Sequence, residues 1–220
     1  LPERIDMTVE AFGTVVPRKQ VTIAAEVPGR IDQLHPRFVA GGQIQKNDLL
    51  VQIDQRSFLL DRTAASVRLE QAKTDIKSLE QEIKNLEQEI QLSRANVRLA
   101  QKEFERIRML AQNQFASKTT VDRTEQQYLQ AKIALQTLEN RLVMTGTMME
   151  QRTAAAAMAE VDLQRAELAW EKTRILSPFD GWVLARALEA GDFVSPGQNI
   201  GVIYEKGALD VDVSIPQEQM

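Results

Sequence analysis

The sequence contains no cysteine and only one histidine, His35, among its 220 residues. Without cysteine, the chain can form neither a disulfide bond nor a zinc–thiolate site, and it has no thiol nucleophile. A single histidine leaves little for catalysis or metal binding that depends on imidazole. We therefore interpret His35, which lies beside Pro36, as an ordinary loop residue.

Aromatic residues and long apolar runs are also scarce. Aromatic residues make up only 5% of the chain. No run of 18 or more apolar residues occurs, so we expect no segment of this sequence to cross a bilayer as a helix. The formal net charge of -4 provides no general basic surface, which argues against nucleic acid as a partner. A sequence poor in aromatics and rich in Ala, Glu, Gln, Leu and Lys is typical of long helices.

One short motif is present twice, as VPGRIDQLHPRFVAGGQIQKNDLLVQI at residues 27–53 and SPFDGWVLARALEAGDFVSPGQNIGVI at residues 177–203. A shift of 150 positions aligns four positions of the first copy with four of the second: Gly41, Ile44, Leu50 and Ile53 with Gly191, Val194, Ile200 and Ile203. The apolar runs between Gly and Pro residues predict short strands joined by turns. In the second copy they predict strands at 174–176, 181–184, 193–194 and 200–204.

One copy of this motif is too small to bury a sheet face by itself. We therefore expect residues 19–55 and 174–206 to pair as one small β-sandwich. Gly41 and Gly191 should then lie in equivalent turns. The fold class that follows is α+β, with a long helical insert between the two halves of the sandwich.

The insert carries a heptad pattern. From Leu69, steps of three and four residues reach apolar side chains as far as Ala111, with Ser93 as the exception. This pattern predicts a helix that packs as a coiled coil, with these residues at the a and d positions. The same steps from Val121 give apolar residues at a and mostly small or polar residues at d. The weakest stretch of the second pattern is 145–152, and it includes Gly146.

The two heptad patterns predict helices at about 57–112 and 119–173. Between them, Thr119 and Asp122 have the spacing of a capping box, and Ser117 is an alternative N-cap. Because the two helices are similar in length and the connection is short, residues 56–173 should form an antiparallel hairpin with its tip near 112–120.

The duplicated motif and its insert resemble a known family. ILSPFDGWV with GDFVSPGQNI, and more loosely VPGRI with GGQIQKNDLL, are similar to the split lipoyl-like domain of periplasmic adaptor proteins. These are the membrane fusion proteins (HlyD-like family) of bacterial tripartite efflux pumps and secretion systems. Asn47 stands where the family usually has Gly. The resemblance implies that residues 1–18 and 207–220, with strand-like segments at 7–16 and 208–216, contribute the first strands of a β-barrel domain.

The resemblance also implies a function. A non-enzymatic adaptor of this kind would link an inner-membrane transporter to a TolC-type outer-membrane channel for the export of small molecules. The transporter we expect first is a proton-driven RND pump. It would be periplasmic, associated with the inner membrane of a Gram-negative bacterium through segments beyond these residues, and would assemble as a homo-oligomer of six copies. An ABC-type exporter or a type I secretion system is the alternative transporter. The exported substrate and the type of anchor stay open.

A function of a different class would be a biotinyl or lipoyl carrier subunit of an enzyme. Carrier domains present a lysine in a short motif such as Met-Lys-Met, and neither that tripeptide nor Asp-Lys-Ala occurs here. We therefore expect no cofactor and no metal. Nor does the sequence contain a catalytic constellation, since its many carboxylates stand at ion-pair spacings such as Glu80 and Lys84.

The predicted hairpin tip holds the candidate binding residues. Arg106, Leu110 and Ser117 have the spacing Arg-x3-Leu-x6-Ser, which matches the tip motif through which the family's adaptors meet the outer-membrane channel. Arg106 and Leu110 are four residues apart on one helix face and fall at positions c and g, outside the a and d positions. In a purely structural interpretation, Leu110 packs under the loop and Ser117 only caps the second helix.

Overall fold

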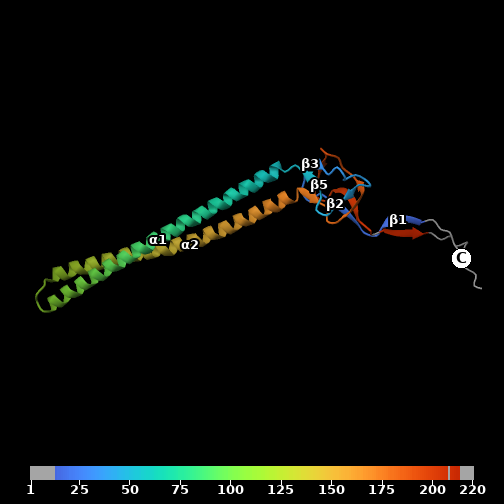
Figure 1. Ribbon diagram of the computed structural model, residues 1–220. Coiled ribbons are helices and arrows are strands. Elements are labelled where there is room, and N and C mark those ends of the chain that lie inside the picture. The colour runs from blue at the N-terminus through green and yellow to red at the C-terminus, as the bar shows by residue number, and fades with distance from the viewer. Residues whose placement is uncertain (1–12, 208, 214–220) are drawn as a thin grey trace, which may run out of the picture. The chain divides into compact units, whose positions relative to one another are not determined.

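The computed structural model describes residues 13–207 and 209–213 (Figure 1). Helices α1 (Arg56–Gln112) and α2 (Lys118–Glu171) follow one another in the chain, as the heptad pattern predicts. The chain divides into two compact units. One unit contains the strands and the helix ends up to Arg62 and from Arg165 onward, and the other is the helical segment Thr63–Gln164.

Two four-stranded antiparallel sheets contain the duplicated motif. The first has the order β2 (Gln20–Ala24), β9 (Asn199–Glu205), β7 (Gly181–Arg186), β4 (Gln43–Ile44). The second has the order β6 (Arg174–Leu176), β5 (Leu49–Ile53), β3 (Gly29–Leu34), β8 (Phe193–Val194). Each sheet combines strands from both copies, so neither copy forms a sheet alone. The prediction that the copies pair as one sandwich is confirmed.

The two copies are tied together by reciprocal backbone hydrogen bonds. The Gly41 N–H donates to the C=O of Val183 (2.8 Å), and the Gly191 N–H donates to the C=O of Ile31 (2.9 Å). Gly41 and Gly191 both have positive φ, 78° and 94°, a region that glycine enters without steric cost. The predicted equivalence of these two turns is therefore confirmed.

Asn47 and Gly197 repeat this relationship at the next turn. Their N–H groups donate to Ser177 and Ala25 respectively, both at 2.8 Å. Asn47 has φ 69° and Gly197 has φ 82°. Asparagine tolerates the left-handed region better than most residues, which explains how it replaces glycine in the first copy.

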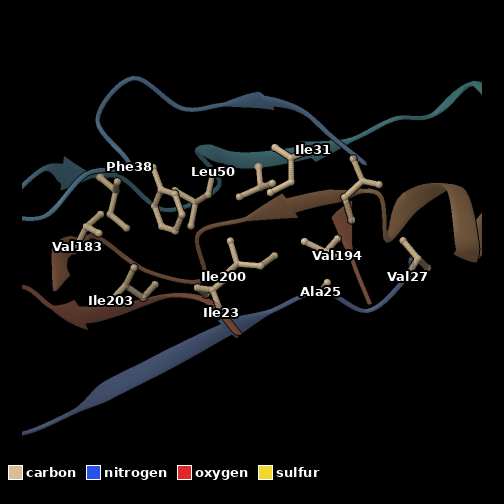
Figure 2. Close-up of a cluster of buried hydrophobic side chains, with 13 residues drawn as sticks. Ile23, Ala25, Val27, Ile31, Phe38, Leu50, Val183, Val194, Ile200 and Ile203 are labelled. Atoms are coloured by element: carbon tan, nitrogen blue, oxygen red, sulfur yellow. The ribbon is translucent and has the colours of Figure 1, made fainter. Parts of the chain in front are cut away.

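The core of the sandwich is a cluster of buried apolar side chains from both copies. Figure 2 shows that side chains from both copies, among them Leu50 and Ile200, point into one cluster, where both are fully buried. Phe38 is the largest of these buried side chains. It fits because Gly201 has no side chain: a Cβ at that position would lie 2.7 Å from the ring.

The helical unit is a hairpin held together by pairs of residues from α1 and α2. Ion pairs join Arg141 to Glu82 (2.8 Å) and Arg94 to Glu139 (2.9 Å). The rings of Phe104 and Tyr128 stack with centroids 6.1 Å apart. The farther a residue of α1 lies from the tip in sequence, the farther its partner on α2 lies from it too, so the helices are antiparallel, as predicted.

The predicted a and d positions form the facing surfaces of the hairpin. In α1 every one of them from Leu69 to Ala111 is buried or half-buried. In α2 the same holds from Val121 to Trp170 with one exception, Arg152, whose side chain is exposed and pairs with Asp75 (3.6 Å). The guanidinium group remains in water because no buried carboxylate is available to offset its desolvation.

Two predictions need correction or restriction. The N-cap of α2 is Ser117 and not Thr119, because α2 already begins at Lys118.

Outside the sandwich, β1 (Gly13–Pro17) pairs with β10 (Leu209–Val213) as a two-stranded antiparallel sheet. The remaining parts of the strand-like segments expected at 7–16 and 208–216 lie outside the described residues. That these strands begin a barrel domain stays a prediction.

Candidate partner-binding site at the hairpin tip

Helix α1 ends in a compact turn at the tip. The Phe115 N–H donates to the C=O of Leu110 (2.9 Å), and the Gln114 N–H donates to the C=O of Ala111 (3.0 Å). With Gln114 at φ 61°, this is a Schellman motif, which commonly brings an apolar side chain after the turn next to one in the last helical turn. Here those two positions are Phe115 and Leu110.

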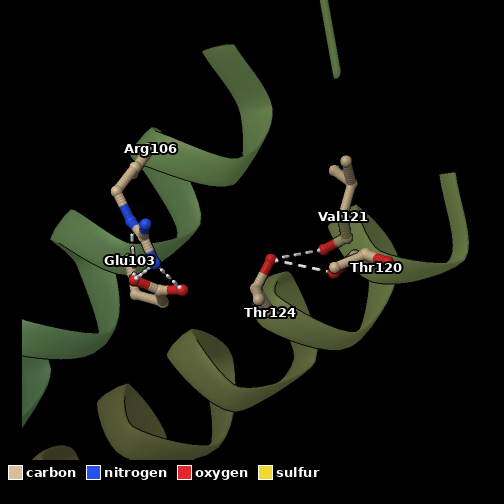
Figure 3. Close-up of polar contacts among 5 residues, drawn as sticks. All are labelled: Glu103, Arg106, Thr120, Val121 and Thr124. Atoms are coloured by element: carbon tan, nitrogen blue, oxygen red, sulfur yellow. Dashed lines mark hydrogen bonds and ion pairs between the residues drawn. The ribbon is translucent and has the colours of Figure 1, made fainter. Parts of the chain in front are cut away.

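Helix α2 begins with a side-chain cap. Ser117 Oγ accepts a hydrogen bond from the Thr120 N–H (3.2 Å) and shares a second one with Thr120 Oγ1 (2.8 Å). Capping by serine satisfies a backbone N–H that the helix itself leaves without a partner. One turn later, the buried Thr124 hydroxyl donates to the C=O groups of Thr120 and Val121 (Figure 3). The structural role foreseen for Ser117 is therefore present.

Arg106 lies on the outer surface of α1 near the tip. Its guanidinium group donates to the carboxylate of Glu103 through Nε (3.0 Å) and Nη2 (2.7 Å) (Figure 3). The side chain remains 63% exposed. Exposed ion pairs within one helix contribute little to stability, so Arg106 can exchange Glu103 for a carboxylate or carbonyl of a partner at little cost.

The tip also presents an apolar surface. Leu110 is 37% exposed, Met109 is 59% exposed and Phe115 is 81% exposed. Leu110 therefore keeps about a third of its surface open to solvent, although the turn places Phe115 next to it. Large exposed apolar side chains that cluster are characteristic of protein interaction sites. We refer to Met109, Leu110 and Phe115 together as the apolar tip.

The three residues selected from the sequence all lie at this end of the hairpin, two on α1 and one at the start of α2. Phe115 was not among them. Its signal was present in the sequence, since it is the one large apolar residue in the connection NQFAS. A large aromatic side chain in a short polar turn has no core to enter and is therefore exposed.

The rest of the described structure offers no competing chemical centre. Among residues 13–207 and 209–213, no group of three or more His, Asp or Glu side chains is arranged to hold a metal ion. Within the same residues, neither helix has an apolar stretch long enough to span a membrane.

The sequence was compared with known protein families and proteins. The family described as RND MFP, barrel-sandwich hybrid domain, matches residues 19–205. The chain is 25% identical over 220 residues to the multidrug resistance protein MdtA of Proteus mirabilis (strain HI4320), covering 99% of this chain and 43% of the relative. It is 22% identical over 210 residues to the probable multidrug resistance protein EmrK of Escherichia coli (strain K12), covering 90% and 52%.

Among solved structures, MacA from Actinobacillus actinomycetemcomitans is similar in fold, with a TM-score of 0.54 and 19% sequence identity. The match covers 96% of this chain and 56% of MacA.

The chain spans about half the length of the curated relatives it matches. Membrane fusion proteins are adaptors and not enzymes, in agreement with the sequence-based expectation. Because the family match extends over both sandwich halves and the hairpin between them, the chain belongs to the RND membrane fusion proteins and carries their barrel-sandwich hybrid domain.

Proposed function

We propose that this chain is the hairpin-bearing part of a periplasmic adaptor that links an inner-membrane transporter to a TolC-type outer-membrane channel. The transporter we favour is an RND pump that exports small molecules, because the matching family is that of RND membrane fusion proteins. The relatives MdtA and EmrK are named multidrug resistance proteins, which supports export as the process. The adaptor acts in the periplasm as a homo-oligomer of six copies.

The observation that carries the channel contact is the apolar tip. Leu110 is 37% exposed and Phe115 is 81% exposed, and both lie outside the a and d positions that pack the two helices together. Arg106 adds an exposed cation beside them. A surface with apolar anchors next to an arginine has the composition of interaction hot spots. We assign Arg106, Leu110 and Ser117, with Phe115 in addition, to contact with the end of the channel.

The test is export by the full-length protein that carries Leu110→Asp. The substitution should abolish export, because it places a carboxylate in the apolar contact. The fold should change little, because Leu110 lies outside the a and d positions and the change in helix propensity is well under about 1 kcal/mol. Leu184→Asp in β7 is the matched control, since Leu184 is 45% exposed and far from the tip in sequence. Normal export by Leu110→Asp at the usual expression level would contradict the proposed contact between the tip and the channel.

Two further variants separate docking from helix capping. Ser117→Arg removes both the cap and the hydroxyl. It should lower the stability by roughly 1 kcal/mol, and it should also abolish export. Ser117→Asp keeps a good N-cap and should preserve stability, but it places a charge at the contact. Loss of export with Ser117→Asp at unchanged thermal stability is the expected result. Normal export by Ser117→Asp would mean that Ser117 caps α2 and does not contact the channel.

A further inference from the structure

The methionines that the structure describes all lie in the hairpin, and most of them are exposed. Met109, Met144, Met148 and Met158 are between 54% and 73% exposed, whereas Met149 is half-buried. Methionine is ordinarily one of the most buried residue types. Because the chain has no cysteine, these thioethers are its most readily oxidised side chains.

Met149 holds an unusual position in the heptad pattern of α2. Between residues 143 and 155 it is the only apolar residue at an a or d position, and the others are Thr145 and Arg152. The Thr145 hydroxyl donates to a C=O of its own helix (2.9 Å), and the Arg152 side chain is exposed. Met149 is therefore the one a or d residue of α2 that can give α1 an apolar contact in this stretch.

The part of α1 that Met149 faces is apolar as well. The interhelical ion pairs on either side of Met149 place the facing segment of α1 at 75–82. That segment contributes Ile76 and Leu79 at a and d positions, and both are half-buried. A surface groove in this stretch is lined by Leu79 and Met148, among others. The contact is thus apolar, local and within reach of a small solute.

We propose that Met149 is an oxidation site whose sulfoxide opens the hairpin locally. With a hypohalous acid as the oxidant, the lone pair of Sδ takes the halogen and releases hydroxide; water then adds its oxygen to sulfur, and halide and two protons leave. Sulfur loses two electrons and the halogen gains them. The product is a polar sulfoxide at a position that packs an apolar side chain. Because no other apolar a or d residue of α2 supports this stretch, it loses its contact with α1.

The exposed methionines beside Met149 make the response graded. Met144 and Met148 are 67% and 54% exposed, so their sulfoxides stay in water and should change the fold little. They consume oxidant first, and the hairpin opens only after they have reacted. Methionine sulfoxide reductases reverse the reaction: a dithiol becomes a disulfide, the sulfoxide oxygen leaves as water, and the restored thioether closes the hairpin again.

Titration of the purified protein with hypochlorous acid tests this order of events. Peptide mass spectrometry identifies each methionine that has gained oxygen, and amide hydrogen exchange at 145–152 reports local opening. Exchange should stay constant while only the exposed methionines carry oxygen, and it should rise by about tenfold once Met149 does. Exchange in the sandwich should not change. The proposal is overturned if exchange rises before Met149 reacts, if it does not rise afterwards, or if Met149 stays unoxidised when the exposed methionines have all reacted.

Substitutions separate the two classes of methionine. Met149→Leu keeps an apolar residue of similar volume and cannot gain oxygen, so its exchange should stay slow after the same treatment. Met149→Gln imitates the polar sulfoxide and should exchange about tenfold faster without oxidant. Met148→Gln is the matched control and should exchange as the wild type does. Incubation of the oxidised protein with both reductases, one for each sulfoxide epimer, should restore slow exchange. Equal rises in treated Met149→Leu and treated wild type would assign the opening to other residues and refute the proposal.

Discussion

The β-sandwich and the helical hairpin bury their apolar residues to very different extents. In the sandwich, Ile31, Phe38 and Leu50 are at most 1% exposed. In the hairpin, most a and d residues remain half-buried, and Leu86, at 2% exposed, is the most buried residue of α1. Two sheets can enclose a core between them, whereas two helices shield each other on one side only. The sandwich thus encloses its own core, whereas the hairpin leaves much of its apolar surface in contact with solvent.

The largest expected effect is in the sandwich. Phe38→Ala should destabilise it by roughly 3–5 kcal/mol, since it removes a fully buried ring and leaves a cavity that the sheets cannot fill. Trp182, on β7, reports unfolding of this unit by fluorescence during denaturation. Circular dichroism at 222 nm reports the helices. A loss below about 1 kcal/mol would mean that the core around Phe38 relaxes freely.

A smaller effect is expected in the hairpin. Leu86→Ala should cost about 2 kcal/mol, the lower end for a buried leucine, because only one facing helix lines the space that is vacated. Leu92→Ala is the matched control on the same helix, as Leu92 is 74% exposed. It should change stability by less than about 0.5 kcal/mol in the single copy. Equal losses for the two variants, measured by thermal melting, would contradict the assigned heptad.

The weakest stretch of the hairpin can be strengthened. A Cβ added to Gly146 meets no atom within 4 Å, so Gly146→Ala should stabilise α2 by about 1 kcal/mol. Amide hydrogen exchange at 145–152 should be faster than at 135–142 in the wild type and should slow in the variant. Ala134→Gly, at an exposed position of the same helix, should destabilise by a similar amount. Slower exchange at 145–152 than at 135–142 in the wild type would contradict the prediction that 145–152 is the least stable part of the hairpin.

The smallest effect concerns pH. Hydrogen bonds from the side chain and backbone of Arg56 lower the pKa of the Asp54 carboxyl to about 2. A carboxyl with a lowered pKa in the folded state contributes stability above its ordinary pKa of 3.8, and this contribution is lost as the pH falls toward 2. Asp54→Asn should therefore flatten the loss of stability in this window. The change should be small, because the Arg56 side chain is 90% exposed. An unchanged acid-denaturation curve would show that the pair contributes nothing measurable.

Much of this fold follows from spacing alone. The heptads beginning at Leu69 and Val121 predict which side of each helix is shielded, because burial repeats with the period of the helix. The 150-residue shift predicts that Gly41 and Gly191 occupy equivalent turns, because both positions need a positive φ. The left-handed backbone conformation of Asn47 could not be predicted from the sequence, because asparagine is equally common in turns that do not need a positive φ.

The candidate site was predicted less completely. A motif identifies Arg106, Leu110 and Ser117 by spacing, but it gives no information about exposure. The exposure of Phe115 depends on the turn at Gln114, whose left-handed conformation is unusual for glutamine. For the same reason, the choice between Ser117 and Thr119 as N-cap required the structure, because both residue types cap well and only the path of the backbone decides.

The reciprocal bonds between the two motif copies also have a consequence for how the protein folds. Gln55 and Thr173, joined by a hydrogen bond of 2.7 Å, are 118 positions apart. Closing a flexible loop of that length costs about 4 kcal/mol of chain entropy or more. A hairpin that zips from its short connection at Phe115 brings these ends together in small steps instead. During synthesis, the first copy leaves the ribosome long before the second exists. We therefore expect the sandwich to form only after the helices have brought the second copy to the first.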